Sequence, residues 1–290
     1  MDARNNPILV IDSGLGGLTV VRALLNRLPG ERIIYFGDTA RLPYGTKTPE
    51  TIQHYIHQIV QWGLRHQPKH VVLACNTASA LALPVMRGRF SPIPITGVVE
   101  PGARAAAGAT NIPEPVIGVI ATEATIRSGA YARAIHGRRH RAKLILTSTP
   151  LLVPMIEEGR SSDDPLVQLA LKQYLKSMID HKIDVLVLGC THYPLLKKAI
   201  RTVVGPQVSI IDSAYQCAED VAARLSRANL WASLRSGDDR NRFLAYVTDD
   251  PDRFAKLAPR FLGFVVDSPL RVAPEVLYQQ EIRPAMCQPA

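Results

Sequence analysis

Short, continuously apolar runs alternate with longer amphipathic segments along most of the chain. In order, the apolar runs read PILVID, RIIYFGD, HVVLAC, PITGVVE, PVIGVIA, AKLILTS, IDVLVLGC and VSIIDS. Unbroken rather than alternating apolar character predicts strands that are covered on both faces. Segments with helical periodicity lie between the runs, such as 50–66 and 163–181, and Pro165 falls where the second of these helices would begin.

Strands that alternate with helices predict an α/β fold with largely parallel sheets. The segments HVVLACNTASALALPV and IDVLVLGCTHYPLLKKAI share one order: strand, Cys, Thr-containing turn, and helix with a nearby Pro. Their cysteines, Cys75 and Cys190, lie 115 residues apart, which fits one repeat of a domain-sized unit. We therefore predict two similar lobes related by pseudo-symmetry, with residues 1–98 and 211–290 in one lobe and 99–210 in the other.

Polar clusters follow several of the predicted strands. DSGLGG comes after the first run, GDTARLPYG after the second, CNT after the third and CTH after the seventh. In folds of this class, ligands bind beyond the carboxyl ends of the strands. The shared position of these clusters predicts one site, which lies between the two lobes.

Two thiols in matched settings suggest a specific chemistry. Cys75 and Cys190 each close an apolar run and precede a helical segment. A thiol ordinarily titrates near about 8.5, and the N–H groups of a helix N-terminus favour its thiolate, which can act as a nucleophile, a metal ligand or a base. On opposite sides of a cleft, one thiol can remove the α-proton from one face of an amino acid while the other delivers a proton to the opposite face.

Simpler roles stay open at this point. Either cysteine could be a buried apolar thiol, and the two could bind zinc with His192, although the rest of a zinc-binding pattern is missing. No function is expected of Cys217, in the helical run AYQCAEDVAARL, or of Cys287, in the polar tail RPAMCQPA. All four cysteines are expected to be free thiols.

Seven ordered stretches also carry a resemblance to a known family. They read IDSGLGGLTV, YFGDTARLPYG, ACNTASA, GVVEPGA, GVIATEATIRSGAY, LGCTHYPLL and VTDDPDRFAKLAPRFLG. On these residues the chain closely resembles glutamate racemases, of the cofactor-independent aspartate/glutamate racemase superfamily. The last stretch is similar to glutamate racemases in particular, rather than to the aspartate branch.

The resemblance implies the catalytic residues. Cys75 and Cys190 correspond to the two acid/base thiols, which serve opposite enantiomers. Asp12 corresponds to the carboxylate partner of Cys75, and His192 to the imidazole partner of Cys190. Helix capping is the alternative role for Asp12, and anchoring of its turn is the alternative for His192.

A further carboxylate and a set of substrate-binding residues are implied in the same way. In PLLVPMIEEG we favour Glu157 as the assisting carboxylate, with the adjacent Glu158 as the alternative register. The positions that match substrate-binding residues are Asp12, Ser13, Pro43, Tyr44, Gly45, Asn76, Thr77, Thr122, Thr191 and His192. Hydroxyls, an amide and N–H groups of turns suit a substrate with two carboxylates and an ammonium group.

The resemblance implies interconversion of L- and D-glutamate without a cofactor, which supplies D-glutamate for peptidoglycan synthesis. The residues agree, because GLGG lacks the fuller spacing of a dinucleotide-binding loop and no lysine is placed to bind pyridoxal phosphate. Two alternatives remain. One is a racemase of another acidic amino acid, such as aspartate, and the other is a low-turnover gyrase-binding protein on the same fold.

Composition adds expectations about partners and location. The net charge is +9, but the basic residues are dispersed, and the densest run, HGRRHRAK at 136–143, is expected to be a solvated connection. Binding of nucleic acid or gyrase is therefore possible but unsupported, and a homodimer is possible without a recognisable interface. MDARNNPILVID has no apolar signal core and no stretch is long enough to span a bilayer, so we expect a cytoplasmic protein that does not enter membranes.

Overall fold

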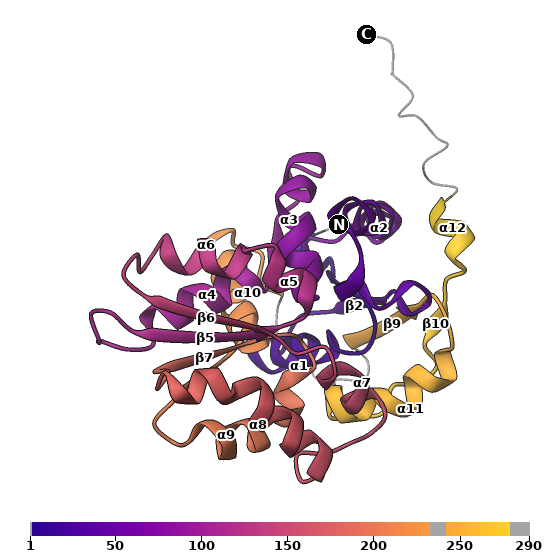
Figure 1. The fold of residues 1–290 in the computed structure, drawn as a ribbon. Coiled ribbons are helices and arrows are strands. Elements are labelled where there is room, and N and C mark those ends of the chain that lie inside the picture. The colour runs from indigo at the N-terminus through magenta and orange to yellow at the C-terminus, as the bar shows by residue number, and fades with distance from the viewer. Residues whose placement is uncertain (1, 233–241, 279–290) are drawn as a thin grey trace.

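The structure, a computed structural model, describes residues 2–232 and 242–278. Two separate β-sheets form its centre, and helices cover both faces of each sheet (Figure 1). The strand pairs of the described residues are all parallel. The predicted α/β class with parallel sheets is therefore confirmed.

The first sheet has six strands in the order β10-β9-β2-β1-β3-β4. Their bounds are Leu270–Arg271 (β10), Phe243–Val247 (β9), Ile33–Gly37 (β2), Ile8–Asp12 (β1), His70–Leu73 (β3) and Ile95–Gly97 (β4). In central strand β1, Ile11 pairs with both Phe36 and Leu73. This parallel register brings the carboxyl ends of β1, β2 and β3 to one edge of the sheet.

The second sheet has four strands in the order β6-β5-β7-β8. Their bounds are Lys143–Ser148 (β6), Val116–Ala121 (β5), Val185–Gly189 (β7) and Ser209–Asp212 (β8). The division of the chain into lobes stays a prediction, but its boundary after residue 210 would cut β8, which pairs with β7 from Ser209 to Asp212. The segment VSIIDS completes the second sheet before the chain returns to the first.

Helices bury both faces of the first sheet. One face carries α2 (Pro49–Gly63), α3 (Asn76–Arg89) and α12 (Pro274–Tyr278), and the other carries α1 (Leu18–Arg27), α10 (Ser213–Arg227) and α11 (Pro251–Leu262). Within β1, Leu9 and Ile11 pack into the cluster of α2 and α3, whereas Ile8 and Val10 pack into the cluster of α1. Successive side chains of a strand point to opposite faces, so covering both faces requires the unbroken apolar run seen in the sequence.

The second sheet is covered in the same way. α4 (Val99–Gly108) and α6 (Ala130–His136) lie on one face, α8 (Pro165–Asp180) and α9 (Lys197–Val204) lie on the other, and α5 (Glu123–Arg127) and α7 (Leu152–Glu157) are short (Figure 1). Asp164 caps α8 by accepting a hydrogen bond from the Leu166 N–H, and Pro165 is its first residue, as predicted. Short 3₁₀ turns occupy Ala3–Asn5 (η1), Thr39–Arg41 (η2), Tyr44–Thr46 (η3), Leu64–His66 (η4) and Tyr193–Leu196 (η5).

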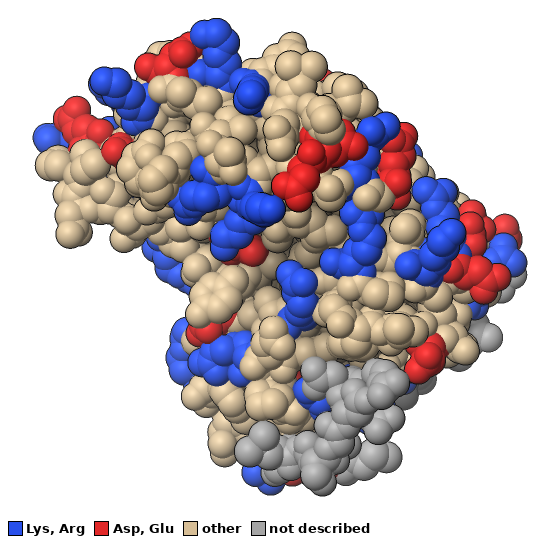
Figure 2. All heavy atoms as spheres, turned by 90° about the horizontal axis from the view of Figure 1, so that it is seen from below, with Lys and Arg blue, Asp and Glu red and all other residues tan. Residues whose placement is uncertain are grey.

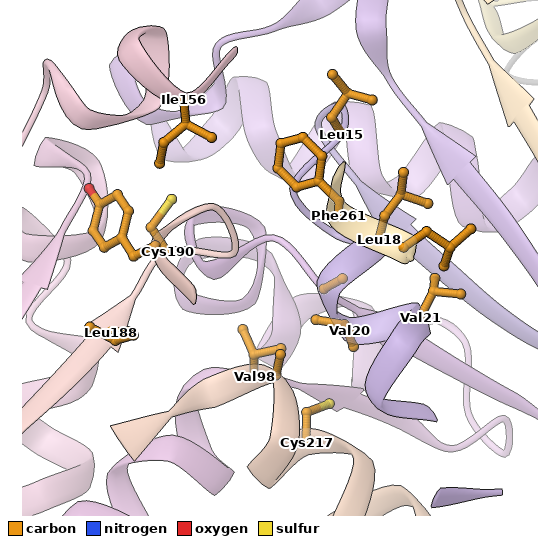
Figure 3. Packing of buried hydrophobic residues seen from close by; sticks show 14 of the residues in the cluster. Leu15, Leu18, Val20, Val21, Val98, Ile156, Leu188, Cys190, Cys217 and Phe261 are labelled. Atoms are coloured by element: carbon orange, nitrogen blue, oxygen red, sulfur yellow. The ribbon is translucent and has the colours of Figure 1, made fainter. Parts of the chain in front are cut away.

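One hydrophobic cluster connects the two sheets. Helix α10 packs against both α1 and α4, and Cys217 on α10 is fully buried, in agreement with the packing role expected of it. Figure 3 shows Cys217 near Val98 at one end of this cluster, with Cys190 and Ile156 at the other end. The described cysteines are free thiols, and Cys287 lies outside the described residues.

The surface carries both signs of charge. On the face seen in Figure 2, Lys and Arg are interspersed with Asp and Glu rather than gathered in one area. Arg138 and Arg141 of the basic run are exposed between α6 and β6, and Lys143 is exposed at the start of β6, as expected for a solvated connection. Within the described ranges, no helix is both long and apolar enough to cross a membrane.

A buried ion pair stabilises the amino-terminal edge of the first sheet. Lys69 Nζ lies 2.5 Å from a Glu31 carboxylate oxygen, and both side chains are at most 2% exposed. Lys69 also donates hydrogen bonds to the backbone carbonyls of Arg4 and Leu230. The two charged residues precede β3 and β2, so the pair lies at the opposite edge from the polar clusters described above.

Replacing Lys69 with Met would leave the Glu31 carboxylate buried without its cation. We expect the free energy of unfolding, measured by urea denaturation, to fall by about 3 kcal/mol or more. Lys198→Met is the matched control, because the side chains of the Lys198–Asp163 pair are 77% and 74% exposed. That change should lower the free energy of unfolding by less than about 0.5 kcal/mol. Similar losses in the two variants would contradict a stabilising role for the buried Lys69–Glu31 pair.

Candidate active site

A cavity of about 560 Å³ opens where strands of both sheets end. The predicted residues that line it are Ser13, Pro43, Tyr44, Gly45, Cys75, Asn76, Thr77, Thr122, Glu157, Cys190, Thr191 and His192. Asp12 is different, because it is fully buried at the end of β1 and lies outside the lining. The polar clusters that the sequence assigns to one site therefore meet around one cavity.

Cys75 is presented at the junction of β3 and α3. Strand β3 ends at Leu73, and Cys75 is the residue immediately before the first turn of α3. The thiol is 7% exposed, so it reaches the cavity with almost no other access to water. This position places it beside the N–H groups that open the helix.

The surroundings of Cys75 favour its neutral form. Burial is the largest cause that raises the pKa of the Cys75 thiol to about 12, and the negative charge of Asp12 adds to it. Hydrogen bonds from the Ala78 N–H and from Ser13 oppose this shift only in part. Cys75 is therefore a protonated thiol at neutral pH.

Asp12 is a buried carboxylate with spare hydrogen-bonding capacity. Its Oδ2 accepts a hydrogen bond of 2.9 Å from the Gly14 N–H, while its Oδ1 is buried and has no partner among the described residues. Burial raises the pKa of Asp12, and the Gly14 N–H and the nearby His192 act in the opposite direction. A buried acceptor without a partner costs about 1–3 kcal/mol.

Cys190 lies at the end of β7, next to a chain of two further groups. Its Sγ is 3.8 Å from His192 Nδ1, and His192 Nε2 is 3.0 Å from Glu157 Oε1. Phe261 packs edge-on against the imidazole ring, with the ring centroids 5.4 Å apart. A thiol, an imidazole and a carboxylate thus form one hydrogen-bonded series.

Charge is stabilised along this series. Burial alone would lower the pKa of His192, but hydrogen bonds and charge interactions with Cys190 and Glu157 outweigh it and raise the pKa to about 10. Burial likewise opposes ionisation of Glu157, yet the hydrogen bond to His192 holds its pKa below the usual value. At neutral pH the imidazole is protonated, and its positive charge lies between the Cys190 sulfur and the Glu157 carboxylate.

The geometry distinguishes the two adjacent glutamates. Both line the cavity, but only Glu157 contacts His192, whereas Glu158 pairs with Arg160 and its side chain is 64% exposed. The favoured register of the sequence analysis is therefore the one that the hydrogen bonds support.

Close packing of loops from the two sheets fixes the His192 turn. A Cβ atom at Gly16 would lie 2.2 Å from Thr191 Oγ1 and 2.4 Å from His192 Nδ1, so only glycine fits there without displacing the turn. The Thr19 hydroxyl donates a hydrogen bond of 2.9 Å to the Thr191 carbonyl across the same contact.

Three threonine hydroxyls join the sheets on the other side of the cavity. Thr77 Oγ1 lies 2.9 Å from Thr122 Oγ1 and 3.2 Å from Thr125 Oγ1, and the last two are 2.9 Å apart. Thr77 belongs to α3, whereas Thr122 and Thr125 belong to the N-terminal turn of α5. The cluster brings hydroxyls from both halves of the molecule to one wall of the cavity.

Asn76 and Tyr44 contribute in different ways. The Asn76 Oδ1 accepts a hydrogen bond of 2.7 Å from the Tyr131 hydroxyl, and its Nδ2 is buried with no partner among the described residues. Tyr44 lines the cavity, but its hydroxyl donates to the buried Asp38 carboxylate. The amide therefore has a free donor, whereas the tyrosine hydroxyl is already engaged.

The cavity also contains residues that the sequence analysis did not select. They are Gly14, Leu42, Thr46, Glu123, Thr149, Pro150, Val153, Pro154 and Arg253. Arg253 lies in the quoted stretch VTDDPDRF, but its residue type alone gave no role. Among the described residues, no group of three or more His, Cys, Asp or Glu is arranged to hold a metal ion.

Comparison with known proteins establishes the family. Residues 8–220 match the family model described as Asp/Glu/Hydantoin racemase. The chain belongs to this family. The expected superfamily, and with it the enzyme class of an amino-acid racemase, is confirmed.

Individual relatives and solved structures agree. The glutamate racemase of Syntrophus aciditrophicus is 45% identical over 258 residues, which are 89% of this chain and 93% of the relative. The crystal structure of glutamate racemase from Francisella tularensis in complex with D-glutamate has a TM-score of 0.84 and 37% identity, and covers 93% of this chain and 98% of that one. The crystal structure of glutamate racemase from Thermus thermophilus in complex with beta-chloro-D-alanine has a TM-score of 0.82 and 41% identity. The match covers 94% of this chain and 99% of that one.

The raised pKa of Cys75 predicts an unusual alkylation profile. In the folded protein the rate of iodoacetamide modification, followed by mass spectrometry of the Cys75 peptide, should keep rising to at least about pH 10 without a plateau, because only the thiolate reacts. In urea the rate for the same peptide should be half-maximal near the ordinary thiol pKa of about 8.5 and should level off about 1.5 pH units above it. A plateau at the same pH in folded and unfolded protein would show that burial and Asp12 do not act on this thiol.

Proposed function

We propose that the chain interconverts L- and D-glutamate, with Cys75 and Cys190 as the two proton-transferring thiols. One observation carries the proposal: two buried cysteines, each at the end of a parallel strand of a different sheet, line the same cavity. Inversion at a carbon atom needs an acid and a base on opposite faces. Thiols delivered from two sheets meet that requirement.

The proton balance of the reaction is simple. The thiolate on one side takes the α-proton, which leaves a carbanion, and the thiol on the other side gives its proton to the opposite face of that carbon. No electrons are transferred to or from the substrate. At the end the two sulfurs have exchanged protonation states, and exchange with water resets them.

The groups beside the thiols divide this work. His192, protonated and held by Glu157, places a positive charge next to the Cys190 sulfur. Cys75 holds its proton at neutral pH and is ready to act as the acid. The ammonium group of a bound amino acid would lower the cost of charge on either sulfur, and the charge of the buried Asp12 acts on the Cys75 side.

The cavity wall suits an amino acid with two carboxylates. The unpaired Nδ2 of Asn76, the hydroxyls of Thr77 and Thr122, and the N–H groups that open α3 can bind an anion. Ser13 and the η3 turn with Pro43 and Gly45 line another part of the cavity and can hold a second carboxylate. Such contacts, made in a cavity from which water is displaced, stabilise the developing carbanion without a cofactor.

The relatives support glutamate as the substrate. The relatives are named glutamate racemase, and the match covers nearly their full length. The Francisella tularensis enzyme was crystallised with D-glutamate. On this basis we assign the chain to the supply of D-glutamate for peptidoglycan, a role that fits the cytoplasmic location expected from the sequence.

The function is tested by circular dichroism of glutamate and of aspartate incubated with the purified protein. Either glutamate enantiomer should reach an equal mixture of both, with a larger kcat/KM than for aspartate. Cys75→Ala and Cys190→Ala should each lower the rate of racemisation at least about a hundredfold, because each removes an acid/base group.

Cys217→Ala is the matched control, since Cys217 is buried outside the cavity lining and should leave kcat unchanged. Faster turnover of aspartate than of glutamate would refute glutamate as the substrate, but the assignment of the active site would stand. Racemisation that survives either active-site change would refute the two-thiol assignment.

A further inference from the structure

Arg253 has a position in the cavity that the mechanism above does not use. It lies in the first turn of α11 and lines the main cavity. It also lines a second, smaller cavity of about 140 Å³, together with Gly14, Leu42 and Glu157, which border both spaces. The exposed guanidinium therefore lies where the active site meets this side opening.

The charges around the cavity make this residue distinctive. Among the described residues that line the main cavity, Arg253 is the one Lys or Arg, whereas Glu123, Glu157 and Glu158 supply three carboxylates. These three carboxylates pair with Arg127, His192 and Arg160, respectively. Glutamate carries a net negative charge, so a cation that has no such partner at the cavity attracts it.

The side chain of Arg253 is available, although its helix is fixed. The Arg253 N–H donates to the Asp250 carboxylate, 3.0 Å away, which caps α11. The next residue, Phe254, is buried in the cluster that joins the sheets. No hydrogen bond or ion pair to a described residue engages the guanidinium, so its donors remain free for a ligand.

Its charge already acts on the catalytic series. Of the causes that determine the pKa of Glu157, burial and the His192 interactions come first, and the charge of Arg253 is a further one that lowers it. Asp249 and Asp250 border the smaller cavity beside Arg253, and they are the acidic neighbours with which a substrate carboxylate would compete.

We propose that Arg253 binds a carboxylate of the incoming amino acid at the mouth of the cavity and so favours dicarboxylic over neutral substrates. A guanidinium suits this task because it can donate two parallel hydrogen bonds to one carboxylate. The inference rests on the proposed racemisation of glutamate. It adds a residue for substrate capture and selectivity, not one for proton transfer.

The test compares two charge deletions on one helix. Arg253→Gln and Lys256→Gln remove the same charge from α11, but Lys256 is exposed and does not line either cavity. Arg253→Gln should lower kcat/KM for glutamate about tenfold, mainly through a higher KM, with kcat changed less than about twofold. Lys256→Gln should stay close to the unchanged protein in both parameters.

Ionic strength provides a readout that a purely structural role would not change. For the unchanged protein and for Lys256→Gln, kcat/KM should fall as sodium chloride is added, because salt screens attraction between the substrate and the cavity mouth. Arg253→Gln should show a flatter dependence, and Arg253→Lys should restore the slope.

The outcomes separate the two proposals. Equal kinetics for Arg253→Gln and Lys256→Gln, or a loss confined to kcat with a lowered thermal midpoint, would overturn the role of Arg253. Failure of the unchanged protein to racemise glutamate would instead overturn the proposed function.

Discussion

Parallel pairing brings the carboxyl ends of neighbouring strands to the same edge of a sheet, and the candidate site depends on this constraint. Asp12 and Cys75 follow neighbouring strands of the first sheet, and Cys190 follows a central strand of the second. Segments far apart in the chain therefore reach one cavity without any long loop. The cost is that both faces of each sheet must be covered, which is why apolar runs and helices alternate along the whole chain.

The two thiols occupy unequal surroundings despite their similar place in the fold. Cys75 has a buried carboxylate as its neighbour, and its pKa is raised to about 12. Cys190 has a protonated imidazole as its neighbour, because hydrogen bonds with Cys190 and Glu157 outweigh burial and raise the pKa of His192. The site therefore has a protonated thiol on one side and a cationic imidazole beside the thiol on the other. Substrate charge must change this balance during each turnover, since the proposed reaction runs in both directions.

Much of the fold was predictable because the apolar runs are long and uninterrupted. Pro165 was enough to place the start of α8. Strand β10 has two residues and follows no such run, so its pairing depends on contacts that only the folded chain provides. The run VSIIDS is typical of a strand in either sheet, and only its pairing with β7 shows that it belongs to the second sheet.

The site was predictable where residue type and position both carried information. Cysteines, threonines and Asn76 at strand ends were found by that rule and by the resemblance. The hydroxyl of Tyr44 could not be assigned, because its partner Asp38 is recognisable only in three dimensions. Arg253 was missed for the opposite reason: an arginine at the start of a surface helix is common, and only the cavity makes it distinctive.

The central claim is that two different groups handle the two faces of the substrate, and the isotope content of early reaction mixtures tests it directly. L-glutamate is incubated with the unchanged protein in deuterium oxide, and both enantiomers are separated and analysed by mass spectrometry before much product has formed. Two thiols predict deuterium at the α-carbon of the D-glutamate product and protium in the remaining L-glutamate. Protium retained in the product, or deuterium entering the remaining substrate as fast as the product, would show that one group serves both faces and would contradict the account.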